Sequence, residues 1–266
     1  MRVLLTGAGG AIGARLLPRL LDAGHAVIGT INSPDKAQRI RATGAEVVRL
    51  DLLDASAVRA AVLEARPDAI VHQATALSNA RWGRNGLDRT FAVTNRLRTE
   101  GTDALLAAAR DAGVRRFVAQ SFAPYRYVRE GGPVKTEDDP LDPRIPAHST
   151  ETFAAMRQLD RAVTDAGGIA LRYGGFYGAA DDGWAMLVRR RLFPIVGSGD
   201  GVMSFIHLDD AAAATVLALQ HDGPAIYNVV DDEPAPVREW LPALAEALSA
   251  KPPRHLPRWL ARLAAG

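Results

Sequence analysis

The chain has 266 residues, of which 48% are hydrophobic and 23% are charged. This composition is ordinary for a globular protein and excludes an intrinsically disordered chain. The 32 Lys and Arg residues nearly balance the 30 Asp and Glu residues and are scattered among them, so no nucleic-acid partner is predicted. The length suits one large domain rather than two independent ones.

Cysteine is absent from the sequence, which excludes disulfides, thiolate metal sites and cysteine nucleophiles. No metal site is predicted, and a cytoplasmic location is expected by default. The first residues enter a strand and then a glycine turn, so we expect no signal peptide. No apolar run approaches the length needed to span a membrane, so no membrane association is predicted.

Strand-like and helix-like segments alternate from the start of the chain, a pattern typical of a parallel sheet with helices on both faces. The predicted fold class is α/β, a doubly wound, Rossmann-like parallel sheet. Strands are expected at 2–5, 25–31, 46–50, 68–72, 115–119 and 168–173, and helices at 11–23, 34–42, 55–65, 97–112 and 150–165.

The chain is less regular after residue 173. Helices are expected at 184–191, 209–220 and 237–248, and strands at 203–206 and 225–229. We therefore predict a dinucleotide-binding core at 1–173 and a small C-terminal cap at 174–266, with some elements returning to the core. The proline-rich stretch 121–147 is expected to cross the strand ends irregularly, and such long loops in compact domains are usually functional.

Three glycines at a spacing of three, Gly7, Gly10 and Gly13, follow the first strand and open an amphipathic helix. Gly7 permits a tight turn, Gly10 lets the backbone approach phosphate groups, and Gly13 allows the helix to pack closely on the sheet. The backbone at Ala11 and Ile12 and the helix dipole can then face a diphosphate. The turn is predicted to bind the pyrophosphate of a nicotinamide dinucleotide, rather than to be a turn that binds nothing.

The second strand ends without the Asp or Glu that usually binds the ribose of NAD. Asn32 takes this place, and Lys36 and Arg39 follow within two helical turns, where they can meet a 2′-phosphate. The expected cofactor is NADP or NAD, with NADP favoured. Asp51, just past the third strand, is placed either to contact the adenine amine or to cap a turn or helix.

Six short motifs occur in order along nearly the whole chain. Together they resemble the extended short-chain dehydrogenase/reductase superfamily, specifically its NAD-dependent epimerase/dehydratase branch, whose members carry TGxxGxxG, an acidic pair, SSxxVY, LRxxxxYG and FIHVDD segments. The matching stretches are TGAGGAIG at 6–13, DLLD at 51–54, VHQA at 71–74, QSFAPY at 120–125, LRYGGFYG at 171–178 and FIHLDD at 205–210.

The resemblance implies further contacts with the dinucleotide at Leu52, Gln73 and Ala74. It also implies a small-molecule substrate and a homodimer formed through the helices that carry Arg98 and Thr152. Members of the family usually continue past the equivalent of 261–266 into another strand or helix, so the chain is expected to be short for the family.

The family's reaction uses a Tyr, a Lys four residues later, a Ser and commonly an Asn. As the resemblance implies, the Lys lowers the pKa of the tyrosine, and the phenol exchanges a proton with the substrate while hydride moves. Aligning Asp160 with the family's usual acidic residue places Thr152 at the Tyr and Met156 at the Lys. A threonine hydroxyl has a far higher pKa than a phenol, and methionine has neither charge nor donor. The usual proton relay is predicted to be absent.

Several residues are candidates to act in its place. Ser121 is retained, and Thr152 can help to polarise the reacting oxygen. Tyr125 lies four residues after Ser121 and is either a substitute acid or a packing residue. His148 can titrate near neutrality, or it is simply an exposed loop residue.

Three other residues are candidates for binding the substrate. Arg98 stands at the family's Asn position, with Asn95 one helical turn away, and is either a fixed cation for an anionic group or part of a solvated face. Tyr177 and His207 belong to the last two motifs and are expected on the substrate side, although His207 can equally pack where the tail meets the sheet.

Three functions remain open from the sequence. The leading hypothesis is an atypical NAD(P)-dependent oxidoreductase or epimerase-like enzyme that acts on a small polar substrate. The second is a non-redox isomerase, dehydratase or cyclase on the same fold, which the missing Tyr and Lys would suit. The third is a binding protein that senses the dinucleotide rather than using it for chemistry.

Overall fold

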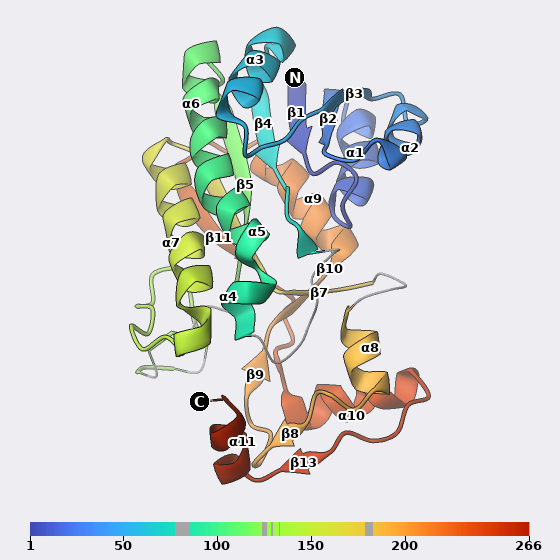
Figure 1. The fold of residues 1–266 in the computed structure, drawn as a ribbon, viewed down its shortest axis with the longest axis vertical. Helices are drawn as coiled ribbons and strands as arrows, with labels where there is room; N and C mark the ends of the chain where they lie inside the picture. The colour runs from blue at the N-terminus through green and yellow to red at the C-terminus, as the bar shows by residue number, and fades with distance from the viewer. Residues whose placement is uncertain (78–85, 124–126, 129, 133, 179–182, 266) are drawn as a thin grey trace.

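The computed structural model describes residues 1–77, 86–123, 127–128, 130–132, 134–178 and 183–265 of the chain. Within them, seven strands form one parallel sheet in the order β11-β6-β5-β4-β1-β2-β3 (Figure 1). The strands are β1 Arg2–Thr6, β2 Ala26–Ile31, β3 Glu46–Arg49, β4 Ala69–His72, β5 Arg116–Phe122, β6 Ile169–Tyr173 and β11 Ala225–Val229.

The sheet is built outward from β1, which pairs with β2 on one side and with β4 on the other. The direction of winding therefore reverses between β1 and β4. In an open α/β sheet, ligands bind outside the carboxyl ends of the strands at such a switch point. The doubly wound, Rossmann-like fold predicted from the sequence is confirmed.

Helices cover both faces of the sheet. One face packs against α1 Gly13–Asp22, α2 Ala37–Arg41 and α9 Leu208–Ala218, which bury mainly small and branched apolar side chains against it. The other face packs against α3 Ala55–Ala65, α6 Thr102–Ala112 and α7 Thr150–Asp165. The inner strands are thus buried on both sides, which explains their continuous apolar runs in the sequence.

The helix expected at 97–112 begins earlier and is not uniform. It comprises α5 Ala92–Arg96, a π-helical turn η3 Leu97–Gly101, and α6. A π turn holds one residue more than an α turn and is frequent at functional sites. Because apolar spacing alone cannot distinguish a π turn from an α turn, the sequence did not reveal it.

Most of the remaining elements after residue 182 form a lobe beyond the carboxyl ends of the strands, seen at the bottom of Figure 1. Within it, Leu241 and Ala245 of α10 pack with Val188 of α8 and Ile195 of β8. The expected strand at 203–206 is instead two short ones in different sheets. Besides the main sheet and the helices given above, the described elements are α4 Gly86–Thr90, β7 Gly175–Tyr177, α8 Gly183–Arg189, β8 Ile195–Val196, β9 Val202–Met203, β10 Phe205–His207, β12 Ala235–Pro236, α10 Val237–Ala247, β13 His255–Leu256, α11 Arg258–Ala265, and the 3₁₀ turns η1 Pro34–Lys36 and η4 Ala147–Ser149.

Two late elements return to the sheet rather than joining the lobe. β11 pairs with β6 as the edge strand, and α9 packs against α1. A core at 1–173 with a cap at 174–266 stays a prediction. In the described part of the chain, no helix is long and apolar enough to cross a membrane.

Candidate active site

The glycine turn joins β1 to α1 at the switch point of the sheet. Gly7 has a φ of +72°, and a Cβ on it would lie 2.7 Å from the carbonyl oxygen of Gln73. A Cβ on Gly13 would collide with the carbonyl oxygen of Gly7, and the amide of Gly10 donates to that same oxygen over 2.9 Å. Side chains are therefore excluded where the turn, β4 and α1 meet. Gly10 and Ala11 are exposed at its outer edge, while Ile12 is buried beneath it.

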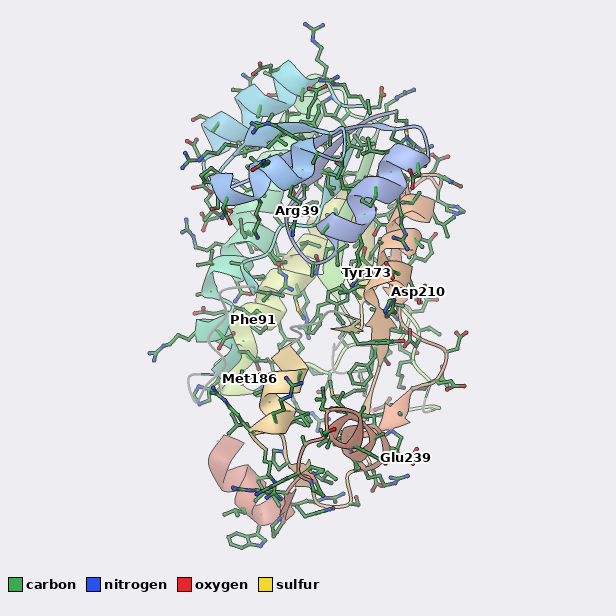
Figure 2. All side chains as sticks on the ribbon, turned by 90° about the vertical axis from the view of Figure 1, so that its right-hand side faces the viewer. Arg39, Phe91, Tyr173, Met186, Asp210 and Glu239 are labelled. Carbon is green, nitrogen blue, oxygen red and sulfur yellow. The ribbon has the colours of Figure 1, made fainter. Side chains whose placement is uncertain are left out.

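Two cationic side chains lie over the outer edge of this turn. A Cβ on Gly9 would lie 2.5 Å from Cδ of Lys36, and the guanidinium of Arg39 donates to the carbonyl oxygen of Gly9 over 3.4 Å. Arg39 is labelled near the upper part of the sheet in Figure 2. Asn32, at the end of β2, is exposed. The structure thus brings both predicted cations to the glycine turn.

Asp51 is exposed and makes a turn with its own chain, because its carboxylate accepts from the amide of Leu53 over 2.9 Å. This contact matches the turn-capping alternative expected from the sequence. Leu52 is buried with the apolar core beneath α3 and α6. Asp54 caps α3 through the amides of Ser56 and Ala57, and these bonds hold the pKa of the Asp54 carboxyl below its usual range.

His72 ends β4 in a fully buried position. Its Nδ1 lies 2.7 Å from Oγ1 of Thr6, and the ring also bonds the backbone of Leu97 in the π turn. Burial, together with the nearby charge of Arg98 and against the opposing effect of the Leu97 bond, lowers the pKa of His72 to about 4. The imidazole is therefore neutral and ties β1, β4 and the π turn together.

Gln73 follows His72 and heads a chain of hydrogen bonds to α9. Thr215 donates to the carbonyl oxygen of Ala211 over 2.7 Å, so its oxygen must accept from Tyr173 at 2.6 Å. Nε2 of Gln73 in turn donates to the phenol over 3.3 Å. Because the amide nitrogen of Gln73 is the donor in this series of hydrogen bonds, its oxygen Oε1 is left as an acceptor at the switch point. This oxygen has no partner among the described residues. Ala74, next in sequence, is half-buried.

Ser121 lies on β5 and is completely buried. In the sheet it pairs with Arg172 of β6, so both side chains extend from the face that α7 covers. Arg172 donates to the carboxylate of Asp160 over 2.8 Å, and both side chains are less than 10% exposed. Among the described residues, Oγ of Ser121 has no hydrogen-bond partner. It can therefore donate to or accept from a bound molecule.

Thr152 lies in the first turn of α7 and links two other elements. Its hydroxyl donates to Oδ1 of Asp88 in α4 over 2.8 Å, and Nδ2 of Asn95 in α5 donates to the hydroxyl oxygen over 3.1 Å. Asp88 also accepts from the backbone amides of Thr152 and Glu151, at 2.8 and 3.2 Å. A carboxylate has no proton to give, so the direction of each bond is fixed.

Met156 lies one turn after Thr152 and is buried. Its thioether packs with Phe153 of the same helix and with apolar or aromatic side chains from β5 and the following loop. The described members of this cluster are Phe153, Met156, Phe122, Tyr127, Leu141 and Ile145.

Arg98 lies in the π turn and is 4% exposed, so the solvated-face alternative does not hold. Its charge adds a smaller contribution to the lowered pKa of His72, which burial mainly causes. Asn95 precedes it by three residues and is 8% exposed, with Oδ1 lacking a partner among the described residues.

Two other candidates lie together at a different place. The rings of Tyr177 and His207 meet edge to face with centroids 5.1 Å apart, at the pairing of β7 with β10. Nδ1 of His207 accepts from the amide of Asp209 over 3.2 Å and so caps α9. Partial desolvation and the carboxylate of Asp231 raise the pKa of Tyr177. His207 thus packs where the tail meets the sheet.

The last two candidates are not brought to Thr152 by any described contact. His148 is exposed in η4, and its Cβ packs against the backbone of Gly86. Tyr125 lies outside the described residues. Asp88, by contrast, was not predicted, because it bonds Thr152 across 64 residues of sequence and belongs to none of the six motifs.

Comparisons with known proteins place this geometry in context. The profile of the NAD dependent epimerase/dehydratase family matches residues 3–229. A 3-diazoavenalumate denitrifying reductase from a Streptomyces species is 44% identical over 98% of this chain and 86% of its own length. The crystal structure of UDP-glucose 4-epimerase from Thermus thermophilus in complex with NAD is 29% identical, with a TM-score of 0.73 over 97% of this chain and 86% of that one. That of UDP-glucose 4-epimerase from Thermotoga maritima, at 20% identity, has a similar fold with a TM-score of 0.76 over 97% of this chain and 86% of that one.

Proposed function

From the fact that the chain belongs to the NAD dependent epimerase/dehydratase family, we propose that it is an NAD(P)H-dependent reductase that removes dinitrogen from a diazo compound. Membership of the family confirms the enzyme class expected from the sequence, an extended short-chain dehydrogenase/reductase-like oxidoreductase or epimerase. The diazo substrate is suggested by the printed name of the 44% identical relative and by the chemistry of the site.

The glycine turn fits a dinucleotide. A Cβ would fill the space at Gly7 or Gly13, and Gln73 directs an unused acceptor from the adjacent strand. We propose that the turn holds the pyrophosphate at the start of α1, where backbone amides and the helix dipole favour negative charge. Lys36 and Arg39 over the edge of the turn support NADP rather than NAD, because cationic side chains there can meet a 2′-phosphate.

The commitment of the Thr152 hydroxyl is the observation that carries the proposal. Its one proton goes to Asp88, and its oxygen accepts from Asn95. In this arrangement it has no proton for a substrate oxygen, which reduction of a carbonyl would require. The thioether of Met156 lies among apolar side chains and supplies no charge that could lower the pKa of a neighbouring acid. The site is therefore suited to a reaction that needs no proton at this position.

Reductive loss of dinitrogen meets that condition. When bound, the reduced dinucleotide supplies hydride, and the overall change is R–N₂⁺ + NAD(P)H → R–H + N₂ + NAD(P)⁺. A C–H bond forms, the C–N bond breaks, and its electron pair leaves with the nitrogen, so no acid is consumed. Ser121, with its uncommitted hydroxyl on the same face of the sheet as α7, is proposed to orient the substrate.

The test is to supply purified protein with NADPH or NADH and a panel of arenediazonium ions, their hydroxy-substituted diazoquinone forms, ketones and nucleotide sugars. We expect loss of the reduced-nicotinamide absorbance together with release of isotopically labelled N₂, and deuterium transfer from labelled cofactor to the product carbon. Ketones and sugars should be inert. Reduction of ketones but not diazo compounds would overturn the proposal, as would turnover without any change in the nicotinamide band, which is the signature of a non-redox enzyme.

Two further features stay proposals. The homodimer expected through the helices that carry Arg98 and Thr152 is tested by sedimentation of the purified chain. A sensing role would require affinities that differ between oxidised and reduced dinucleotide in the absence of turnover, and calorimetry with each form distinguishes it from catalysis.

A further inference from the structure

We infer that the chain Asn95–Thr152–Asp88 selects a positively charged head group, so that the preferred substrate is the cationic diazonium form of a diazo compound. This inference rests on the proposed function, because it names the charge state of the substrate at that same site. It is carried by the direction of two hydrogen bonds and by the charge of Asp88.

The direction of the bonds determines what the site offers. Asp88 can only accept, so the proton of Thr152 points to it, and Thr152 must accept from the amide nitrogen of Asn95. The atom of Asn95 left over is Oδ1, an acceptor on a side chain that is only 8% exposed and lacks a partner for that atom among the described residues. A carbonyl substrate needs donors here, whereas an electron-poor nitrogen needs acceptors.

Asp88 also changes the sign of the local field. The N-terminus of a helix carries about half a positive charge and normally attracts anions. The carboxylate of Asp88 accepts from the amides of Glu151 and Thr152, the second and third residues of α7, and so brings a full negative charge to that position. The balance at this end of α7 is negative, which favours a cation.

The cations that follow Asn95 in the sequence have other neighbours. Arg96 is paired with Glu100, and the charge of Arg98 contributes to the lowered pKa of His72 at the end of β4. The family's lysine position is filled by Met156, so the cation that would repel a diazonium ion is replaced by a neutral, polarisable sulfur. The absence of the usual Tyr and Lys and the presence of Asp88 thus favour the same charge on the substrate.

The preference can be measured without turnover, using two probes of nearly equal shape. These are the meta-hydroxyphenyl trimethylammonium ion and its neutral isostere meta-tert-butylphenol, titrated calorimetrically with and without oxidised dinucleotide. We expect the wild type to bind the cation roughly tenfold more tightly than the neutral probe, the size of effect given by one charged contact. Asp88→Asn keeps an acceptor for α7 but removes the charge, and should abolish the preference.

Glu151→Gln is the matched control, because it removes an exposed negative charge from the same turn of α7 without touching the chain of bonds. It should retain the preference. Thr152→Val and Thr152→Ser form a second pair, since only serine keeps the hydroxyl that fixes the direction of Asn95; valine should weaken cation binding and serine should not.

Equal binding of the two probes by the wild type would overturn the inference, as would a preference unchanged in both Asp88→Asn and Thr152→Val. If the wild type releases N₂ from diazo compounds yet binds both probes equally, only this inference fails. If it prefers the cation but never releases N₂, the proposed function fails and the charge preference stands.

Discussion

The phenolic oxygen of Tyr173 lies 2.6 Å from the hydroxyl oxygen of Thr215, and both side chains are completely buried. This contact bonds β6 to α9. Both elements support the glycine turn, although they lie far from it in the sequence. In Figure 2, Tyr173 lies at the end of the sheet nearest the lobe, beside the helix that carries Asp210. The pair fixes the orientation of Gln73 at the switch point.

Tyr173→Phe should therefore destabilise the protein. It leaves the amide of Gln73 without an acceptor, at a cost of about 1–3 kcal/mol in the free energy of unfolding. Urea denaturation measures this cost, and Tyr227→Phe at an exposed tyrosine is the control, with an expected change within about 0.5 kcal/mol. Burial raises the pKa of Tyr173 to about 12, so the unfolded phenol ionises first. The advantage of the wild type over Tyr173→Phe should shrink as pH rises from about 10 toward 12.

Burial of His72 should make the free energy of unfolding depend on pH on the acidic side, just as Tyr173 does on the alkaline side. Its pKa is about 4 in the folded protein, against an ordinary value of 6.5. Between these values the unfolded chain binds a proton that the folded chain refuses, so stability is lost as pH falls through this window. From pH 7 to pH 5 the loss should be about 2 kcal/mol.

Urea unfolding of the wild type and of His72→Gln at both pH values checks this prediction. The variant lacks the titrating ring and should lose less stability on acidification, whereas His221→Gln, at an exposed histidine, should follow the wild type. An identical pH dependence in wild type and His72→Gln would show that other groups control the acid limb.

Met156→Lys restores the family's residue type but should not restore its chemistry. The ammonium would enter the apolar cluster around Phe153 and Tyr127 without a partner, at a cost of roughly 3–5 kcal/mol in the free energy of unfolding. Met156→Leu conserves volume and should cost less than about 1.5 kcal/mol. Thermal and urea unfolding of the two variants compare these effects, and a lysine variant as stable as the leucine variant would mean that the cluster admits water or a counter-charge.

Arg39→Gln should change the choice of cofactor. Removing the guanidinium beside Gly9 should raise the KM for NADPH about tenfold and leave that for NADH nearly unchanged. Arg41→Gln, at an exposed arginine of the same helix, is the control for a general loss of positive charge. Equal changes for both cofactors would remove Arg39 from recognition of the 2′-phosphate.

The features of the fold and of the site that could be predicted are those encoded by residues close together in the sequence. The turn at Gly7 and Gly13 and the amphipathic α1 are encoded in a few consecutive residues, and both lie where the spacing indicated. The family alignment likewise directed attention to Thr152 and Met156, although their roles stay predictions.

The contacts that define the site were not local. Asp88 precedes Thr152 by 64 residues, and its helix has only five residues, too short for a periodic pattern. The bond between Tyr173 and Thr215 depends on α9 packing beneath the sheet, which no motif reports. The sequence around a single Asp, Thr or Tyr does not indicate which residue the fold will place beside it.

The π turn at Leu97–Gly101 has one more consequence, for how this wall of the site can change. A π turn holds one residue more than an α turn over nearly the same rotation, so deleting one residue there would convert the turn to regular α-helix and leave α5 and α6 close to their present orientations. Asn95 would keep its bond to Thr152, and Leu105 and Ala108 would keep their places in the core. This wall of the site can thus shed one residue, the length of a single codon, without displacing the side chains on either side of the turn.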